Sequence, residues 1–190
     1  MKRWWAITMA LAISSAAWAG GGFAVYGTYA DMKDFDDAGY GGGLKLQADL
    51  VEWLGIELRV QGITGYGGDD PATEDSWLAS GEANLRLMLP VGDAVRLYVG
   101  AGVGYYVFPE YESKAPLGES LEPDVDPEDV WGYFGVAGVE WMISKSVGLF
   151  AEAKYQVGEV EEADIDDETV DIEDGDFGGW GVNAGILFRF

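Results

Sequence analysis

The chain has 190 residues, of which 34 are acidic and 11 basic, and its formal net charge is −23. It contains no histidine and no cysteine, which excludes Ser-His-Asp and Cys-His catalytic sites, disulfide bonds and thiol chemistry. The negative charge argues against nucleic acid, anionic polysaccharide or phosphate ligands without bridging cations. We therefore expect one domain that is not an enzyme and needs no cofactor.

The first residues have the three parts of a secretory signal peptide. Two basic residues are followed by a short apolar run and by an Ala-Trp-Ala cleavage site at 17–19. A membrane anchor is the alternative, but the run is short for a bilayer core of ~30 Å. We expect residues 1–19 to be the signal peptide and residues 20–190 to form the exported domain.

The rest of the chain alternates apolar and polar residues with a period of two, which is typical of β-strands. Each alternating stretch is long enough for a tilted transmembrane strand, which needs ~9–11 residues. The eight predicted strands are 22–31, 40–50, 54–66, 77–89, 94–107, 131–142, 146–157 and 177–190.

The connections between these strands alternate between short and long. Short turns are predicted around 51–53, 90–93 and 143–145, and long loops at about 32–39, 67–76, 108–130 and 158–176. This alternation predicts an all-β fold, an eight-stranded antiparallel up-and-down transmembrane β-barrel. Its short turns would be periplasmic and its long acidic loops extracellular.

Period two alone does not say whether the apolar face points outward. A soluble periplasmic binding barrel would turn that face inward, whereas a membrane barrel turns it toward lipid. Aromatic residues at the strand ends favour the membrane barrel, because bilayer interfaces select aromatic girdles. Those near short turns are Trp53, Trp141 and Phe190, and those near long loops are Tyr66, Trp77, Tyr105, Trp131, Tyr155 and Trp180.

The last eight residues combine a polar residue, a glycine and two terminal aromatics at fixed spacing, in Asn183, Gly185, Phe188 and Phe190. This ending resembles the C-terminal strand of bacterial outer-membrane barrels, which the barrel assembly machinery reads. The whole exported chain resembles small outer-membrane β-barrel proteins, similar to the membrane domain of OmpA and often called porin-like. The resemblance implies insertion into outer-membrane lipid of a Gram-negative envelope. We further expect a monomer.

The predicted inward faces carry both signs of charge. Eight strands leave an interior just wide enough for side chains, and unpaired buried charges are costly, so we expect a plugged lumen with an ion-pair network. The alternative is a narrow, gated barrel that transports ions or small solutes. The predicted network consists of Lys45, Asp49, Glu57, Arg59, Glu82, Arg86, Arg96, Glu140, Glu152, Lys154 and Arg189.

Counted with Asp31 at the edge of the first loop, the four long loops hold 27 of the 34 acidic residues, opposed there only by Lys33 and Lys114. Dense carboxylates suit hard cations such as Ca²⁺, although the spacing does not match an EF-hand. The alternative is a solvated anionic loop without a specific ligand. We expect a structural or surface-interaction role with an extracellular partner that the sequence does not identify. The calcium candidates are Asp164, Asp166, Asp167, Asp171 and Asp174.

Overall fold

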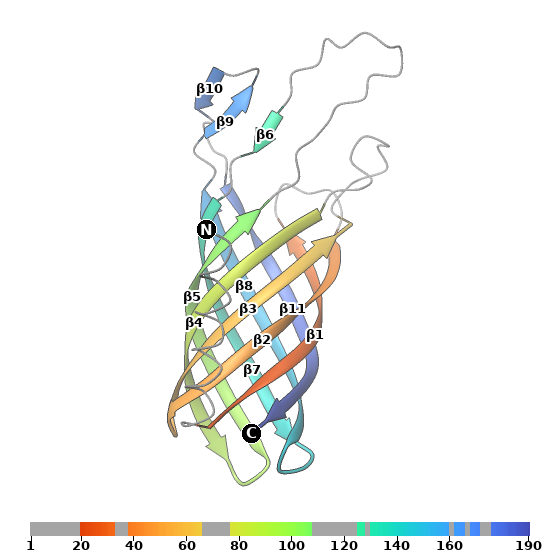
Figure 1. Cartoon of the computed structure of the whole chain (residues 1–190), viewed down its shortest axis with the longest axis vertical. Coiled ribbons are helices and arrows are strands. Elements are labelled where there is room, and N and C mark those ends of the chain that lie inside the picture. The colour runs from red at the N-terminus through yellow and green to blue at the C-terminus, as the bar shows by residue number, and fades with distance from the viewer. Residues whose placement is uncertain are drawn as a thin grey trace, which may run out of the picture.

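The computed structural model forms a closed barrel of eight antiparallel strands, in the order β1-β11-β8-β7-β5-β4-β3-β2 (Figure 1). The structure describes residues 20–32, 38–65, 77–107, 125–127, 130–159, 162–165, 168–171 and 176–190. The barrel strands are β1 (Gly21–Met32), β2 (Gly39–Val51), β3 (Leu54–Thr64), β4 (Trp77–Val91), β5 (Val95–Val107), β7 (Val130–Met142), β8 (Val147–Glu159) and β11 (Asp176–Arg189). The predicted fold class is confirmed, and every predicted strand boundary lies within two residues of the observed one.

The first and last strands close the barrel. Phe23 of β1 pairs with Phe188 of β11, and their rings stack with centroids 4.8 Å apart. Gly21 and Phe190 exchange backbone hydrogen bonds of 3.4 and 3.1 Å. The start of β1 and the end of β11 therefore meet at the end of the barrel that carries the short turns.

Three short connections lie at this end, at residues 52–53, 92–94 and 143–146. We call it the turn end, and the opposite end the loop end. Gly92 has a φ of +70°, a conformation that glycine adopts without strain. The structure corrects two predicted turns. Val51 still belongs to β2 and pairs with Leu54, and Pro90 and Val91 still belong to β4 and pair with β5. Proline is tolerated there because it lies close to the end of the strand.

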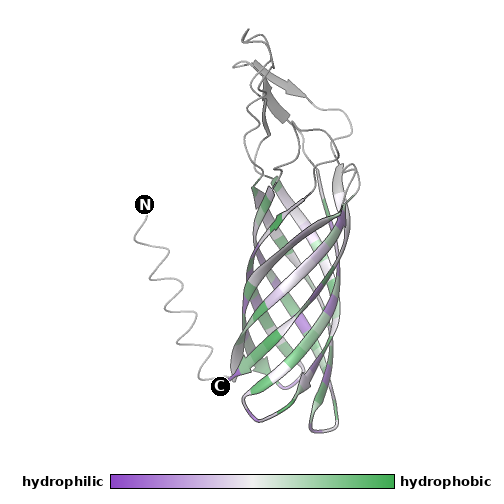
Figure 2. Cartoon of the chain, turned by 90° about the vertical axis from the view of Figure 1, so that its right-hand side faces the viewer, coloured by the Kyte–Doolittle hydropathy of each residue, from purple (hydrophilic) through white to green (hydrophobic). Residues whose placement is uncertain are grey.

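The alternation of apolar and polar residues in the sequence corresponds to an alternation of exposed and buried side chains in the strands. Along β4, residues at even positions from Leu78 to Met88 face the lumen and are buried, while Leu85 and Leu87 are exposed on the outer surface. Figure 2 shows apolar and polar residues alternating along the barrel strands. A barrel with an apolar exterior and a polar interior matches the pattern expected in a bilayer. Among the described residues, no helix has the length and hydropathy that a membrane span requires.

The aromatic residues predicted at the strand ends lie mostly on the outer surface. Trp53 and Trp141 are exposed near the turn end, and Trp131 and Trp180 are exposed near the loop end. Tyr66 lies outside the described residues. Exposed aromatics near both ends are the arrangement that the two interfaces of a bilayer favour.

A second, three-stranded sheet lies above the loop end, in segments predicted to be loops only (Figure 1). Strand β9 (Glu162–Ile165) pairs with both β6 (Val125–Pro127) and β10 (Glu168–Asp171). These strands have three or four residues each, too few to display a readable period of two. The long loops therefore contain short strands that the sequence pattern does not reveal.

Candidate functional site

The lumen is the candidate site, because it gathers the charged side chains that the inward faces of the strands carry. Eight of these residues are at most 4% exposed, four basic and four acidic, so their charges balance. They extend from β2, β3, β4, β7 and β8. The eight are Lys45, Glu57, Arg59, Glu82, Arg86, Glu140, Glu152 and Lys154.

Two glutamates hold the middle of the lumen. Glu57 pairs with Arg59, with Lys45 Nζ at 3.4 Å and with Arg86 Nη1 at 3.2 Å. Glu152 approaches from the opposite wall, with Lys45 Nζ at 3.0 Å and Arg59 Nη1 at 2.8 Å. Both basic groups bridge the two carboxylates, so the two walls are cross-linked through the centre of the barrel.

Toward the loop end, Glu82 carries the uppermost ion pair. It pairs with Lys154 across the lumen, and Arg59 Nε lies 3.6 Å from its Oε2. Its Oε1 also accepts hydrogen bonds from Ser80 Oγ at 2.9 Å and Gln61 Nε2 at 3.2 Å. The neutral donors thus add to the stabilisation of this buried carboxylate.

Toward the turn end, the ion pairs continue to the mouth of the barrel. Arg86 pairs with Glu140, which lies 4.0 Å from Arg96 Nη1. Asp49 then pairs with Arg96 at 3.0 Å and with Arg189. The side chains of Asp49, Arg96 and Arg189 are 15–21% exposed. The structure therefore brings all eleven predicted lumen residues into one continuous series of ion pairs.

Aromatic side chains also pack against the basic groups of the lumen, and they are not part of the predicted ion-pair network. Lys45 Nζ lies 3.5 Å from the ring centroid of Phe150, and the Arg86 guanidinium lies 4.1 Å from that of Tyr98. The Tyr98 hydroxyl also donates a 2.5 Å hydrogen bond to Glu152 Oε2. Both aromatics occupy inward positions in their strands, and this parity is the signal that would have identified them.

An apolar layer lies at the loop end of the lumen, above the ion pairs. Its residues extend inward from β1, β3, β4, β5 and β7 and are at most 6% exposed. We call this layer the apolar cap; it consists of Ala30, Met32, Ile63, Leu78, Tyr106 and Val130. From the loop end downward, the lumen passes from apolar residues to buried charges and then to partly exposed charges.

The residues of the predicted assembly signal also have defined positions in the folded barrel. The Asn183 side chain points into the lumen and donates a 2.9 Å hydrogen bond to Glu152 Oε1. A Cβ at Gly185 would collide with the backbone of Val25 and Tyr26 in β1, so this position requires glycine for close strand packing. The two terminal aromatics lie at the β1–β11 closure.

The predicted calcium candidates are only partly described. Asp164 lies in β9 and Asp171 in β10, whereas Asp166, Asp167 and Asp174 lie outside the described residues. In the described part of the chain, no three or more acidic side chains are grouped as a metal ion would require. Calcium binding therefore stays a prediction.

Solved structures of outer-membrane proteins are similar to this barrel. OprG from Pseudomonas aeruginosa has a TM-score of 0.62 at 16% identity, with 90% of this chain and 96% of that chain covered. Neisserial surface protein A has a TM-score of 0.58 at 16% identity, covering 90% and 97%. Ail of Yersinia pestis, in complex with the heparin analogue sucrose octasulfate, has a TM-score of 0.54 at 15% identity, covering 90% and 98%. At these identities the similarity shows a shared fold.

No curated protein sequence matches the chain. The family described as "Outer membrane protein beta-barrel domain" matches residues 6–190, nearly the whole chain. Together with the closed barrel and its apolar exterior, this match places the protein in the outer membrane, embedded in lipid. The chain belongs to the outer-membrane β-barrel domain family.

Proposed function

We propose that this protein is a closed outer-membrane barrel with a structural or surface-interaction role, and that its lumen is plugged rather than conducting. The observation that carries the proposal is the balanced series of buried ion pairs across the lumen. We also propose that the protein is a monomer and that the barrel assembly machinery inserts it through its C-terminal strand.

The energetics of the buried charges support a closed lumen. Removing one partner of a buried pair costs about 3–5 kcal/mol, because the other charge is left uncompensated. An aqueous path would have to separate several such pairs and displace the aromatic rings that pack against Lys45 and Arg86. A narrow barrel with this filling resists spontaneous opening.

The loops supply the surface for interaction in this proposal. Residues 31–39, 67–76, 108–130 and 158–176 hold 27 of the 34 acidic residues and only two lysines, so the potential there attracts cationic partners and repels polyanions. Ail, by contrast, is described in complex with a heparin analogue, which is a polyanion. We therefore propose that the partner of this chain is a cationic protein surface or a hard cation such as Ca²⁺.

Planar-bilayer conductance of the purified barrel tests the closed lumen. The barrel must first show the heat-modifiable gel mobility of a folded barrel. A folded protein that produces no channel steps agrees with the proposal. Reproducible single-channel steps would contradict it and would favour transport of ions or small solutes.

Calorimetry tests the proposed cation binding. We expect heat of binding at millimolar Ca²⁺ for the native chain, and its loss when Asp164, Asp166 and Asp167 are replaced by asparagine. Replacing Glu52 and Asp93, acidic residues in the short turns, serves as the matched control. Absence of heat for the folded native barrel would exclude calcium and leave the cationic protein surface as the proposed partner.

A further inference from the structure

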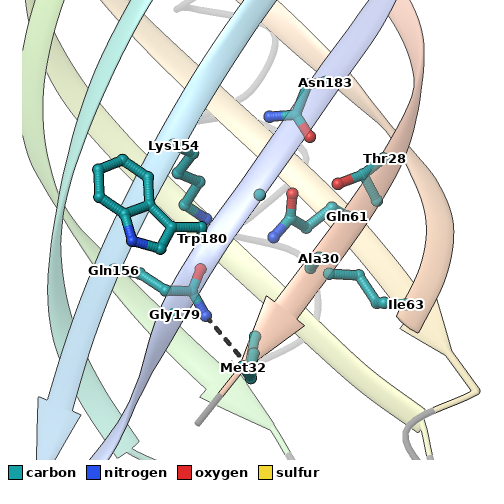
Figure 3. A pocket seen from close by; sticks show the side chains of 11 residues that line it. Thr28, Ala30, Met32, Gln61, Ile63, Lys154, Gln156, Gly179, Trp180 and Asn183 are labelled. Atoms are coloured by element: carbon teal, nitrogen blue, oxygen red, sulfur yellow. Dashed lines mark hydrogen bonds between the residues drawn. The ribbon is translucent and has the colours of Figure 1, made fainter. Parts of the chain in front are cut away.

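The charges of the lumen are unequal in number at its turn end. Of the six basic and five acidic residues in the ion pairs, four of each sign are buried in the middle of the lumen. Near the loop end, for example, Lys154 lines a small cavity whose other polar side chains are neutral, and Glu82 matches its charge (Figure 3). The other three residues are two arginines and one aspartate, so they have a surplus of one positive charge. We call these three residues the turn-end cluster; they are Asp49, Arg96 and Arg189.

Both arginines of the turn-end cluster pair with the same carboxylate oxygen. Arg96 Nη1 lies 3.0 Å from Asp49 Oδ2, and Arg189 Nη2 pairs with this oxygen as well. In β11, Arg189 lies beside Gly22 of β1, which has no side chain, and it reaches over β1 to Asp49 in β2. Two guanidinium groups that bind one oxygen lie close together, so their like charges repel each other. A second anion at this place would relieve that repulsion.

No other acidic side chain balances the surplus charge among the residues that the structure describes. Glu140 lies 4.0 Å from Arg96 Nη1, but it is already paired with Arg86. Glu52 and Asp93 are exposed in the short connections, and neither forms an ion pair with the cluster. The arginine side chains of the cluster are 16–21% exposed, so an anion from outside can reach them.

The height of the turn-end cluster along the barrel indicates which anion is available there. Arg96 follows Val95, which pairs with Trp141, and the Trp141 side chain is 58% exposed on the outer surface. Exposed tryptophans of membrane proteins lie at the level of the lipid headgroups. Phospholipid headgroups contain a phosphate group, and guanidinium groups bind phosphate oxygens through pairs of N–H donors. A phosphodiester carries a single negative charge, which equals the surplus charge of the cluster.

The negative charge of the whole chain does not exclude an anion at this end. Of the 34 acidic residues, 27 belong to the segments 31–39, 67–76, 108–130 and 158–176, which connect strands at the loop end. Their repulsion falls off with distance and is screened by salt. The local surplus of the cluster therefore decides which ions bind at the turn end.

We propose that the turn-end cluster binds one phosphate group, either in a lipid headgroup or as a free ion, through the guanidinium groups of Arg96 and Arg189. Asp49 keeps the two arginines in position, and the phosphate group supplies the negative charge that the lumen lacks. This proposal does not depend on the closed lumen, because the cluster lies at the turn end, beyond the buried ion pairs.

Binding to the folded barrel tests the proposal, with the protein purified from outer membranes of an expression host in a maltoside detergent, which contains no phosphate. Calorimetry with inorganic phosphate probes the free ion, and native mass spectrometry with phosphatidylglycerol probes the headgroup. Whichever probe binds identifies the source of the phosphate group. Arg96→Gln and Arg189→Gln should each weaken binding by at least about tenfold, because each removes a charged donor to the phosphate.

Lys145→Gln is the matched control, because it removes an exposed positive charge from the same end of the barrel and should leave binding unchanged. Asp49→Asn should tighten binding several-fold, because it raises the surplus from one positive charge to two. Loss of structure cannot cause tighter binding, so this variant decides the test if neither arginine variant folds. A folded native barrel that binds neither probe would overturn the proposal. So would binding that both folded arginine variants retain unchanged, or that folded Asp49→Asn does not tighten.

Discussion

Replacing Lys154 by methionine is the sharpest test of the ion-pair network. Lys154 is 3% exposed, and Glu82 is its only ion-pair partner among the described residues. Methionine keeps most of the length of the side chain but removes the charge. As an ion-pair partner among the described residues, Glu82 then retains only the more distant Arg59, whose Nε lies 3.6 Å from its Oε2. We expect the free energy of unfolding to fall by about 3–5 kcal/mol, the cost of leaving one charge of a buried pair uncompensated.

The double variant Lys154→Met with Glu82→Gln should be more stable than Lys154→Met alone. It removes both charges of the pair and leaves the remaining buried charges balanced. Replacing both members of a buried ion pair is often close to neutral, so we expect a loss below about 2 kcal/mol. The double-mutant cycle should then give a coupling energy of at least about 2 kcal/mol between the two residues.

Urea unfolding in lipid vesicles, followed by the fluorescence of the five tryptophans of residues 20–190, measures these changes. Lys145→Met is the matched control, because Lys145 lies exposed in the short connection at 143–146 and its replacement should change stability by less than about 0.5 kcal/mol. A loss for Lys154→Met no larger than that of the control would refute the reasoning. A double variant as unstable as the sum of the two single variants would refute the coupling.

Three further predictions concern the packing, the lipid face and the centre of the lumen. Gly185→Ala should reduce the folded, heat-modifiable fraction on gels, because its Cβ collides with β1, while Gly81→Ala should leave it unchanged. Leu85 faces outward at the middle of β4, and Leu85→Arg should lower the free energy of unfolding in urea by about 2–4 kcal/mol. Val91→Arg, near the turn end, should lower it by only about 0–1 kcal/mol. Tyr98→Phe removes a hydroxyl that donates to a buried glutamate and should cost about 1–3 kcal/mol; equal urea midpoints for variant and native protein would contradict that role.

The barrel itself could be predicted from the sequence because its signals are local. Apolar and polar residues alternate with a period of two within each strand, and the connection lengths indicate which ends of neighbouring strands lie together. The alternation in β4, for example, assigns Glu82 and Arg86 to one face and Leu85 to the other without any knowledge of neighbouring strands. The same parity placed the charges in the lumen.

Most partners inside the lumen could not be predicted, because they come from strands far apart in the sequence. Lys45 meets Glu152 across 107 residues, and Arg189 meets Asp49 across 140. Their pairing depends on how the register of the closed barrel sets the height of each residue. The small sheet of β6, β9 and β10 was missed for a related reason, since its strands are too short to carry a pattern and form only by pairing across loops.

By itself, the sequence determined that eight amphipathic strands alternate with short and long connections, and that polar residues share one face and apolar residues the other. This is so because backbone alternation acts on each strand separately. Only the tertiary structure decided which charges pair and that an apolar cap lies above them at the loop end. Those features follow from closure of the barrel, which brings side chains from separate strands to the same height in one narrow lumen.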